Sequence, residues 1–148
     1  MDGSTSTKPS LCDSSPKCEV LAFTEDDYPL LKSLLEKRHS FVVPYSFLPK
    51  NGFLAKVEGQ PVAIGFLLQT DTPVASISSV CTDPDIAGWK RDMGLIALIK
   101  AIEQCAIAKG FSAISSFTSN EGLSKRYDRM GYSRIDHNAN AFARVLCQ

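Results

Sequence analysis

Two short stretches of the sequence hold the side chains whose types and spacing could do chemistry. The first carries Lys90, Arg91 and Gly94 just before an apolar helical repeat, and the second carries Asn120, with Tyr127 seven residues later. Basic side chains beside the first turn of a helix attract anions such as phosphate, because the first backbone N–H groups of a helix lack partners within it. A tyrosine phenol, with an ordinary pKa near ~10, can donate a proton. Where the two stretches meet, we expect a site for an anionic group beside a proton donor.

Each stretch joins a predicted strand to a predicted helix. The first turn of the longer helix is expected to begin between Lys90 and Gly94, and Gly110 is expected to cap its end. Its apolar stripe repeats at helical spacing and comprises Leu95, Leu98, Ile99, Ile102, Cys105 and Ala106. The order strand, helix, strand, helix favours parallel strands with helices packed across them. These four elements are expected at residues 74–80, 95–109, 111–117 and 122–130.

The first half of the chain adds antiparallel strands and one more helix. Thr24 is an N-cap residue with Asp27 at the capping-box position, and Arg38 and His39 lie where cations favour a helix C-terminus. Gly65 inside a predicted strand indicates a bulge or a close backbone approach. The remaining elements are a strand at 19–23, a helix at 26–38, an irregular segment at 40–52, a hairpin at 52–57 and 61–69, and a closing hairpin at 132–135 and 141–146. The predicted fold class is α/β (α+β), with a mixed, partly antiparallel sheet of six to seven strands and helices on both faces.

Composition excludes several classes of protein. Sixteen basic and sixteen acidic residues cancel, so the net charge gives no reason to expect nucleic acid or an anionic membrane as a partner. No apolar run approaches the length of a membrane-spanning helix, and the five cysteines and two histidines match no zinc pattern. We therefore expect a metal-free cytoplasmic protein with reduced thiols, built as a disordered tail at 1–18 and a single domain at 19–148.

The segment NEGLSKRYDRMGY, together with the order of the predicted elements, resembles the GNAT acyltransferase superfamily. Members of that family commonly show an Asn, a Tyr seven residues on, and Gly-Phe four residues after the Tyr. Asn120, Tyr127, Gly131 and Tyr132 keep these intervals, with Tyr132 in place of the usual Phe. The resemblance covers residues 19–146 and implies a gap between two splayed strands, 76–82 and 111–117, in which the pantetheine of acetyl-CoA lies.

The resemblance also implies roles for particular residues. Tyr127 would be the catalytic acid that gives a proton to the departing thiolate. A backbone N–H in the strand near 80–82 would bind the carbonyl oxygen of the thioester, and the start of the following helix would bind the pyrophosphate. The residues expected to bind acetyl-CoA are Val80, Cys81, Thr82, Lys90, Arg91, Asp92, Met93, Gly94, Leu95 and Asn120.

The chain departs from the family pattern at two points. The phosphate-binding loop of the family has small residues so that its backbone can touch the phosphates, whereas here Met93 and Leu95, or Ile96 in the other register, stand at those positions and Asp92 adds a like charge. Serines replace the carboxylate that many members place on the preceding strand as a general base. The candidates for that base are Asp83, Asp85, Glu58, His137 and a chain of water molecules.

Two functions are therefore compatible with the sequence. One is an N-acetyltransferase that moves an acetyl group from acetyl-CoA to a small-molecule or peptide amine, by direct attack in a ternary complex. The other is a catalytically inactive binding or structural module that has kept the GNAT fold and lost acetyl-CoA binding. The edge strands and the terminal hairpin could also pair two copies into a homodimer.

Overall fold

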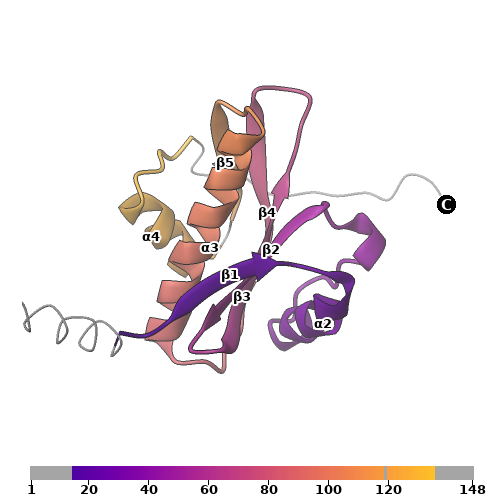
Figure 1. The fold of residues 1–148 in the computed structure, drawn as a ribbon, viewed down its shortest axis with the longest axis vertical. Coiled ribbons are helices and arrows are strands. Elements are labelled where there is room, and N and C mark those ends of the chain that lie inside the picture. The colour runs from indigo at the N-terminus through magenta and orange to yellow at the C-terminus, as the bar shows by residue number, and fades with distance from the viewer. Residues whose placement is uncertain (1–14, 119, 136–148) are drawn as a thin grey trace, which may run out of the picture. The chain divides into compact units, whose positions relative to one another are not determined.

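The computed structural model describes residues 15–118 and 120–135 of the chain (Figure 1). The chain divides into two compact units, Met1–Ser116 and Phe117–Gln148. The first unit contains a five-stranded sheet with the helices α2 and α3, and the described part of the second contains the helix α4.

The sheet of the first unit keeps the strands in chain order from β1 to β5. Neighbours from β1 to β4 are antiparallel, and β5 runs parallel to β4. The strands are β1 (Cys18–Ala22), β2 (Asn51–Val57), β3 (Gln60–Leu68), β4 (Val74–Thr82) and β5 (Ala113–Ser116). This mixed sheet confirms the predicted fold class. It has fewer strands in the described residues than expected, because residues 132–135 do not form a strand, and the strand predicted at 141–146 lies outside the described residues.

Helices cover both faces of the sheet, as predicted. On one face, α2 (Tyr28–Lys37) packs its buried leucines on Ile64 and Phe66 of β3, within a core that also contains Leu31, Leu34, Leu35, Leu54 and Cys81. On the other face, α3 (Gly88–Ala108) approaches Gly65, the residue next to Ile64. Because successive residues of a strand point to opposite faces, α2 and α3 lie on opposite sides of β3 (Figure 1).

The ends of these helices follow from local sequence. Thr24 and Asp27 form the predicted capping box, in which the Thr24 N–H donates to Oδ2 of Asp27 at 2.9 Å, ahead of a short 3₁₀ turn, η1 (Glu25–Asp27), and α2. Gly110 adopts φ +89 just after α3, which confirms it as the capping glycine. The irregular segment before β2 contains one 3₁₀ turn, η2 (Tyr45–Phe47).

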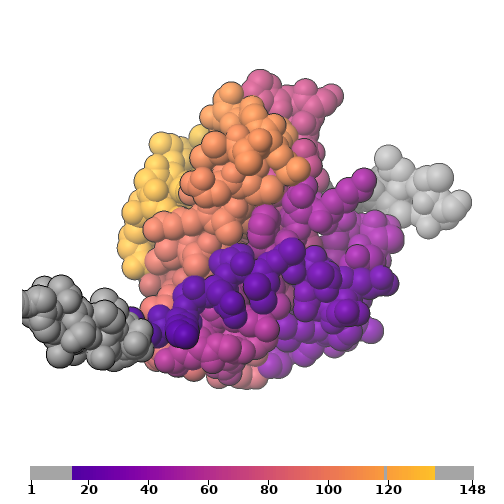
Figure 2. Space-filling view, in the orientation of Figure 1, coloured from indigo at the N-terminus to yellow at the C-terminus, as the bar shows by residue number. Residues whose placement is uncertain are grey.

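The outer strand β1 lies at the surface, where it crosses the molecule as the indigo band in Figure 2. Its burial alternates only weakly, and Leu21 is 42% exposed. The core sits instead around β3, whose residues Val62, Ala63 and Ile64 are fully buried. The most buried part of the first unit is therefore its centre, and β4 and β5 lie beside it.

Candidate functional site

Strand β4 has two halves that differ in what lies beside them. Its first half pairs with the whole of β5, from Val74 opposite Ala113 to Ile77 opposite Ser116. β5 ends there, whereas β4 continues to Thr82. Residues 78–82, the open half of β4, pair with β3 on one side, and no strand of the described residues pairs with their other side. The predicted parallel neighbours are thus paired over part of their length only.

A β-bulge lies within the open half. Gly65 of β3 faces two residues of β4, Ser79 and Val80, at the point where the register shifts. Ser79 adopts φ +55, a left-handed conformation that is uncommon for a residue with a side chain. A methyl group on Gly65 would lie 3.0 Å from Cδ2 of Leu98, so the backbone and α3 approach closely here. Both features confirm the prediction made from Gly65, and a bulge re-aims the backbone groups of its strand.

The last carbonyl of the open half has a cationic partner. The Asp83 N–H donates to the Val62 carbonyl of β3 at 3.2 Å. In a trans peptide the C=O points opposite to the N–H, so the Thr82 carbonyl points away from β3. There it accepts a hydrogen bond from Nε of Arg38 at 2.8 Å, and Nη2 of Arg38 donates to Oγ1 of Thr82. Sequence analysis placed Arg38 only at a helix end, because no local pattern indicates a contact with β4.

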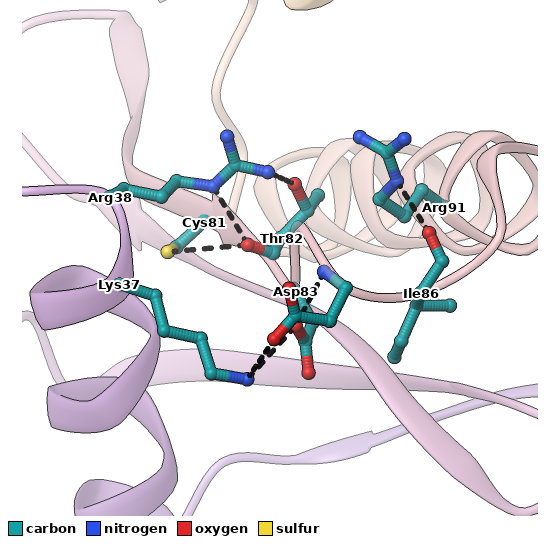
Figure 3. Close-up of polar contacts among 8 residues, drawn as sticks. Lys37, Arg38, Cys81, Thr82, Asp83, Ile86 and Arg91 are labelled. Carbon is teal, nitrogen blue, oxygen red and sulfur yellow. Dashed lines mark hydrogen bonds and ion pairs between the residues drawn. The ribbon is translucent and has the colours of Figure 1, made fainter.

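The loop after β4 is held by the end of α2, as Figure 3 shows. Nζ of Lys37 lies 3.2 Å from Oδ1 of Asp83 and 3.1 Å from Oδ2 of Asp85. The Asp85 N–H also donates to Oδ1 of Asp83 at 3.0 Å. Burial acts to raise the pKa of Asp83, but the Asp85 N–H and the Lys37 ammonium outweigh it and hold that pKa below its ordinary value. Asp83 is therefore ionised and paired, and it is a poor candidate for the general base.

Helix α3 begins earlier than the sequence predicted. Its first residue is Gly88, with Ala87 as the N-cap, rather than a residue between Lys90 and Gly94. Lys90 lies in the first turn, but its Nζ is turned to the β2–β3 hairpin, 3.1 Å from Oε1 of Gln60. The same Nζ lies 3.5 Å from Oε1 of Glu58, which is thereby occupied as well. The cation expected beside the phosphates is thus engaged elsewhere.

Gly94 and Leu95 lie inside α3 and face the sheet. They are therefore part of the helix and do not belong to a loop before it. Both are buried, and a methyl group on Gly94 would overlap Cγ2 of Val62. The glycine lets the helix approach Val62 of β3, so its conformational freedom is not needed for a loop. Asp92 and Met93 are half-buried in the same turn, and the Met93 carbonyl lies 4.0 Å from Sγ of Cys18.

The true first turn of α3 contains a different glycine and a cation. Apart from its chain neighbours and the backbone of the helix itself, the nearest atom to a methyl group placed on Gly88 is Nη2 of Arg91, at 3.7 Å. Nε of Arg91 donates to the Ile86 carbonyl at 3.0 Å, so the guanidinium folds back over the start of the helix (Figure 3). The small residues Ala87 and Gly88 ahead of Arg91 are the sequence signal for this turn, whereas the expected start near Gly94 lies inside the helix.

The open half offers hydroxyl groups and no activated nucleophile. Oγ of Ser78 and Oγ of Ser79 lie 3.4 Å apart, and both residues are half-buried. Burial raises the pKa of the Cys81 thiol, and the Arg38 guanidinium offsets that only in part. A neutral buried thiol is a weak nucleophile, so Cys81 serves the core. Among the described residues, no group of His, Cys, Asp and Glu is placed to hold a metal ion, and no helix is long and apolar enough to cross a membrane.

In the second unit, the motif residues set the ends of α4 (Glu121–Arg129). Asn120 is the N-cap, and its side chain accepts a hydrogen bond from the Leu123 N–H at 2.9 Å. At the other end Gly131 adopts φ +90, and the Tyr132 N–H donates to the Tyr127 carbonyl at 2.9 Å. The rings of Tyr127 and Tyr132 lie 4.8 Å apart. This is a Schellman cap with its usual hydrophobic contact, so the spacing of the four residues describes one capped helix.

The arrangement in the first unit can bind two kinds of group. An unpaired strand edge with a bulge offers backbone N–H and C=O groups to an extended ligand that contains amides. The first turn of α3, with Gly88 open and Arg91 above it, offers backbone N–H groups and positive charge to an anion. The two features are joined only by the short loop that follows Thr82.

Solved structures show which fold this is. No known family profile and no curated protein sequence matches the chain. A ribosomal-protein-alanine N-acetyltransferase from Brucella melitensis has a TM-score of 0.63 at 14% identity, over 85% of this chain and 98% of that one. An aminoglycoside acetyltransferase from an uncultured soil metagenomic sample has a TM-score of 0.58 at 22% identity, over 91% and 99%. Rv2747 from Mycobacterium tuberculosis, solved with CoA and NLQ, has a TM-score of 0.65 at 18% identity, over 83% and 76%.

The chain has the fold of the GNAT acetyltransferases. Within this GNAT fold, β4 and β5 are the parallel neighbours that the family resemblance required, and their pairing stops at Ile77 and Ser116. Of the residues predicted to bind acetyl-CoA, Val80, Cys81 and Thr82 lie together in the open half of β4. Lys90 to Leu95 lie within α3 and are not a loop. Asn120 and Tyr127 belong to the second unit.

Proposed function

We propose that the protein is an acyltransferase that takes an acyl group, acetyl in the simplest case, from a thioester of coenzyme A and transfers it to an amine. The observation that carries the proposal is the open half of β4, where parallel pairing with β5 stops at Ile77 and the strand continues to Thr82. A pantetheine arm contains two amides in an extended chain. It can therefore take the place of a strand beside residues 78–82.

The residues of the first unit fit such a donor at two points. No strand of the described residues pairs with the outer side of the open half of β4, so an extended arm could pair there. The first turn of α3 suits the pyrophosphate, since no side chain crowds Gly88 and Arg91 adds positive charge. We place the pyrophosphate at Gly88 and not at Gly94, because Gly94 is buried against Val62. Solved GNAT neighbours with CoA, such as the mycobacterial protein, support a donor of this class.

The proposed reaction needs no covalent enzyme intermediate. The amine nitrogen attacks the thioester carbonyl carbon, a C–N bond forms and the C–S bond breaks. The amine loses one proton and the sulfur gains one, so the products are an amide and a free thiol. We propose a backbone N–H of residues 80–82 as the donor to the carbonyl oxygen and the Tyr127 phenol as the acid that protonates the sulfur. Because Asp83 and Asp85 are paired with Lys37, we propose water as the route by which the amine loses its proton.

The acceptor is proposed as a small-molecule or peptide amine. Among the neighbours, one is named for acetylation of an aminoglycoside and another for acetylation of a ribosomal-protein alanine, which supports an amine in general. The segment between α2 and β2 carries exposed aromatic side chains, with Phe41 72% and Phe47 58% exposed. We propose this segment as the part of the chain that selects the acceptor.

A binding titration tests the donor directly. The full-length protein is titrated with CoA by calorimetry and thermal unfolding, with adenosine 3′,5′-bisphosphate as the comparison ligand, which lacks the pantetheine arm and one phosphate of the pyrophosphate. We expect CoA to bind more tightly than the bisphosphate, and at a hundredfold its Kd to stabilise the fold by about 2.7 kcal/mol. Absence of any binding at millimolar CoA would refute the proposed function.

The role of Tyr127 is tested by its replacement with Phe. If the phenol protonates the thiolate, Tyr127→Phe should lower kcat more than tenfold and leave the affinity for CoA unchanged. Tyr132→Phe is the matched control, since the two rings contact each other and both changes remove one hydroxyl group. Equal kcat values for the two variants would remove Tyr127 as the acid.

A second function is favoured by two observations. The Arg38 guanidinium already occupies the Thr82 carbonyl, and the later glycine of the family pattern, Gly94, is buried in α3. Both would follow if the chain were a GNAT-fold module that binds no thioester and works through contacts with another protein. The CoA titration separates the two functions, because the module would give no binding at any concentration of CoA.

A further inference from the structure

The contact between Arg38 and Thr82 lies where the proposed donor would bind. Nε of Arg38 donates to the Thr82 carbonyl at 2.8 Å, and Nη2 donates to the Thr82 hydroxyl (Figure 3). Thr82 is the last residue of β4, and it is the one buried polar residue within the described part of the chain. A two-point contact from a charged fork is stronger than a neutral hydrogen bond, so this carbonyl is well occupied.

The direction of the Thr82 carbonyl means that Arg38 competes with an extended ligand for this carbonyl. The Asp83 N–H points to the Val62 carbonyl of β3, so the Thr82 C=O points to the other side of β4. That is the side on which β5 pairs with the first half of β4, as far as Ile77. An extended ligand that continued the β5 side of the sheet would need this carbonyl as an acceptor for one of its amide N–H groups.

The backbone of Arg38 is held in place, whereas its side chain is long and flexible. Arg38 is the C-cap of α2, and its backbone N–H bonds to the carbonyls of Leu34 and Leu35, each at 3.2 Å. The next residue, His39, adopts φ +54 and turns the chain away. Arg38 itself is only half-buried. The guanidinium can therefore leave Thr82 by a change of rotamer, without a movement of α2.

We propose that Arg38 is a gate on the donor site: it occupies the Thr82 carbonyl in the free protein and must leave before a pantetheine amide can bind there. The inference rests on the proposed function and concerns its regulation. With a gate of this kind, the affinity for the donor equals the affinity of the open protein multiplied by the fraction of time that the gate is open. If Arg38 occupies the carbonyl nine-tenths of the time, the apparent Kd is about tenfold higher than that of the open protein.

The opposite role makes the opposite prediction. If Arg38 holds the end of β4 in the shape that the donor needs, its removal would weaken binding. Loss of a positive charge near a phosphate-bearing ligand would also weaken binding, whatever the contact with Thr82. The neighbouring Lys37 controls for that charge, since it binds Asp83 and Asp85 on the same loop without touching Thr82.

The experiment compares the Kd of CoA for the full-length protein, Arg38→Met and Lys37→Met. We expect Arg38→Met to bind CoA three- to tenfold more tightly than the unmodified protein, and Lys37→Met to bind it no more tightly. Adenosine 3′,5′-bisphosphate, which lacks the arm, should bind no more tightly to Arg38→Met. If Arg38→Met does not fold, Arg38→Lys keeps the charge but not the two-point fork and should show a smaller gain in the same direction.

Each result decides one of the two proposals. Unchanged or weaker CoA binding by a folded Arg38→Met or Arg38→Lys, while the unmodified protein binds CoA, overturns the gate and leaves the proposed function standing. An equal gain for the ligand without the arm also overturns the gate. Absence of binding by every form overturns the proposed function and the gate with it.

Discussion

Two glycines of α3 lie only six residues apart and have opposite surroundings. Gly94 is buried, and a methyl group there would overlap Val62 of β3. Gly88 begins the helix, and the nearest atom to such a methyl group is Nη2 of Arg91, 3.7 Å away. Gly94 is the glycine that matches a family pattern, yet its local role is to let a helix approach a sheet. Gly88 matches no pattern, yet it leaves the start of the helix accessible.

The same contrast appears in the second unit. The intervals between Asn120, Tyr127, Gly131 and Tyr132 suggested a cofactor site, and they also fit the N-cap and Schellman cap of α4. Such a motif can serve to begin and end a helix, whether or not a ligand binds. For this chain, motif residues explain how the fold is built, and accessible groups beside them indicate where a ligand could bind.

The difference between the surroundings of Gly94 and Gly88 is tested most directly by adding one methyl group at each glycine. Gly94→Ala should lower the free energy of unfolding by about 2 kcal/mol, because Val62 is fully buried and cannot move aside. The sign is informative, since glycine to alanine in an exposed helix interior stabilises by about 1 kcal/mol. Gly88→Ala is the matched control and should change stability by less than about 0.5 kcal/mol. Urea unfolding of both variants measures the difference.

The clash itself can be isolated by a double-mutant cycle. Val62→Ala removes the methyl group that the new side chain of Gly94→Ala would overlap. The loss caused by Gly94→Ala should therefore be smaller in the Val62→Ala background than alone, by about 1 kcal/mol or more. Purely additive effects would show that Gly94 is required for another reason, and the contrast with Gly88 would lose its physical basis.

In the second unit, Asn120→Ala tests whether a motif residue caps a helix or binds a ligand. If Asn120 serves as a cap, its loss should destabilise α4 by about 1 kcal/mol, because the Leu123 N–H loses its acceptor. Amide hydrogen exchange of Leu123 measures this locally, and it should accelerate without any ligand present. Asn120→Ser, which can also cap a helix, should restore most of the protection. Exchange of Leu123 that is unaffected by Asn120→Ala would assign the residue to ligand binding instead.

Most of the fold could be predicted from local patterns. Alternation and turn residues located the antiparallel strands, and Thr24, Asp27 and Gly110 located helix ends through side-chain and backbone hydrogen bonds that act over a few residues. Gly65 even indicated the bulge on the neighbouring strand. The start of α3 was wrong because Gly94 was taken as a loop glycine, although its role depends on Val62, more than thirty residues away.

The candidate site was predictable only in outline for the same reason. The parallel order of β4 and β5 follows from the alternation of strands and helices. The engagement of Lys90 by Gln60, of Thr82 by Arg38 and of Asp83 by Lys37 depends on pairs that are distant in sequence. No local pattern carries such contacts, and they decide which polar groups near the site are accessible.

The smallest expected effect concerns the loop that leads from β4 to Gly88, and it is a pH dependence. The pKa of Asp83 is held below its ordinary value, so its contribution to stability is fully present above the unfolded-state pKa of about 4 and is lost as the pH falls through the lower folded-state value. Protonation of Asp83 also removes one of the two carboxylate partners of Lys37. Below about pH 4 we therefore expect amide exchange in the loop between β4 and Gly88, and at Gly88 itself, to become faster relative to exchange at Gly94. Gly94 should stay protected.

The comparison with Asp83→Asn assigns this change to one carboxyl group. The difference in unfolding free energy between the unmodified protein and Asp83→Asn should be constant above about pH 4. It should shrink below that pH, because the carboxylate that distinguishes the two proteins is then neutralised. Asp71→Asn, at the exposed turn between β3 and β4, provides the background for removal of a distant acid. A difference that stays constant down to pH 2 would mean that Asp83 does not hold the loop. The accessible start of α3 would then have to be maintained by Arg91 and the Ile86 carbonyl instead.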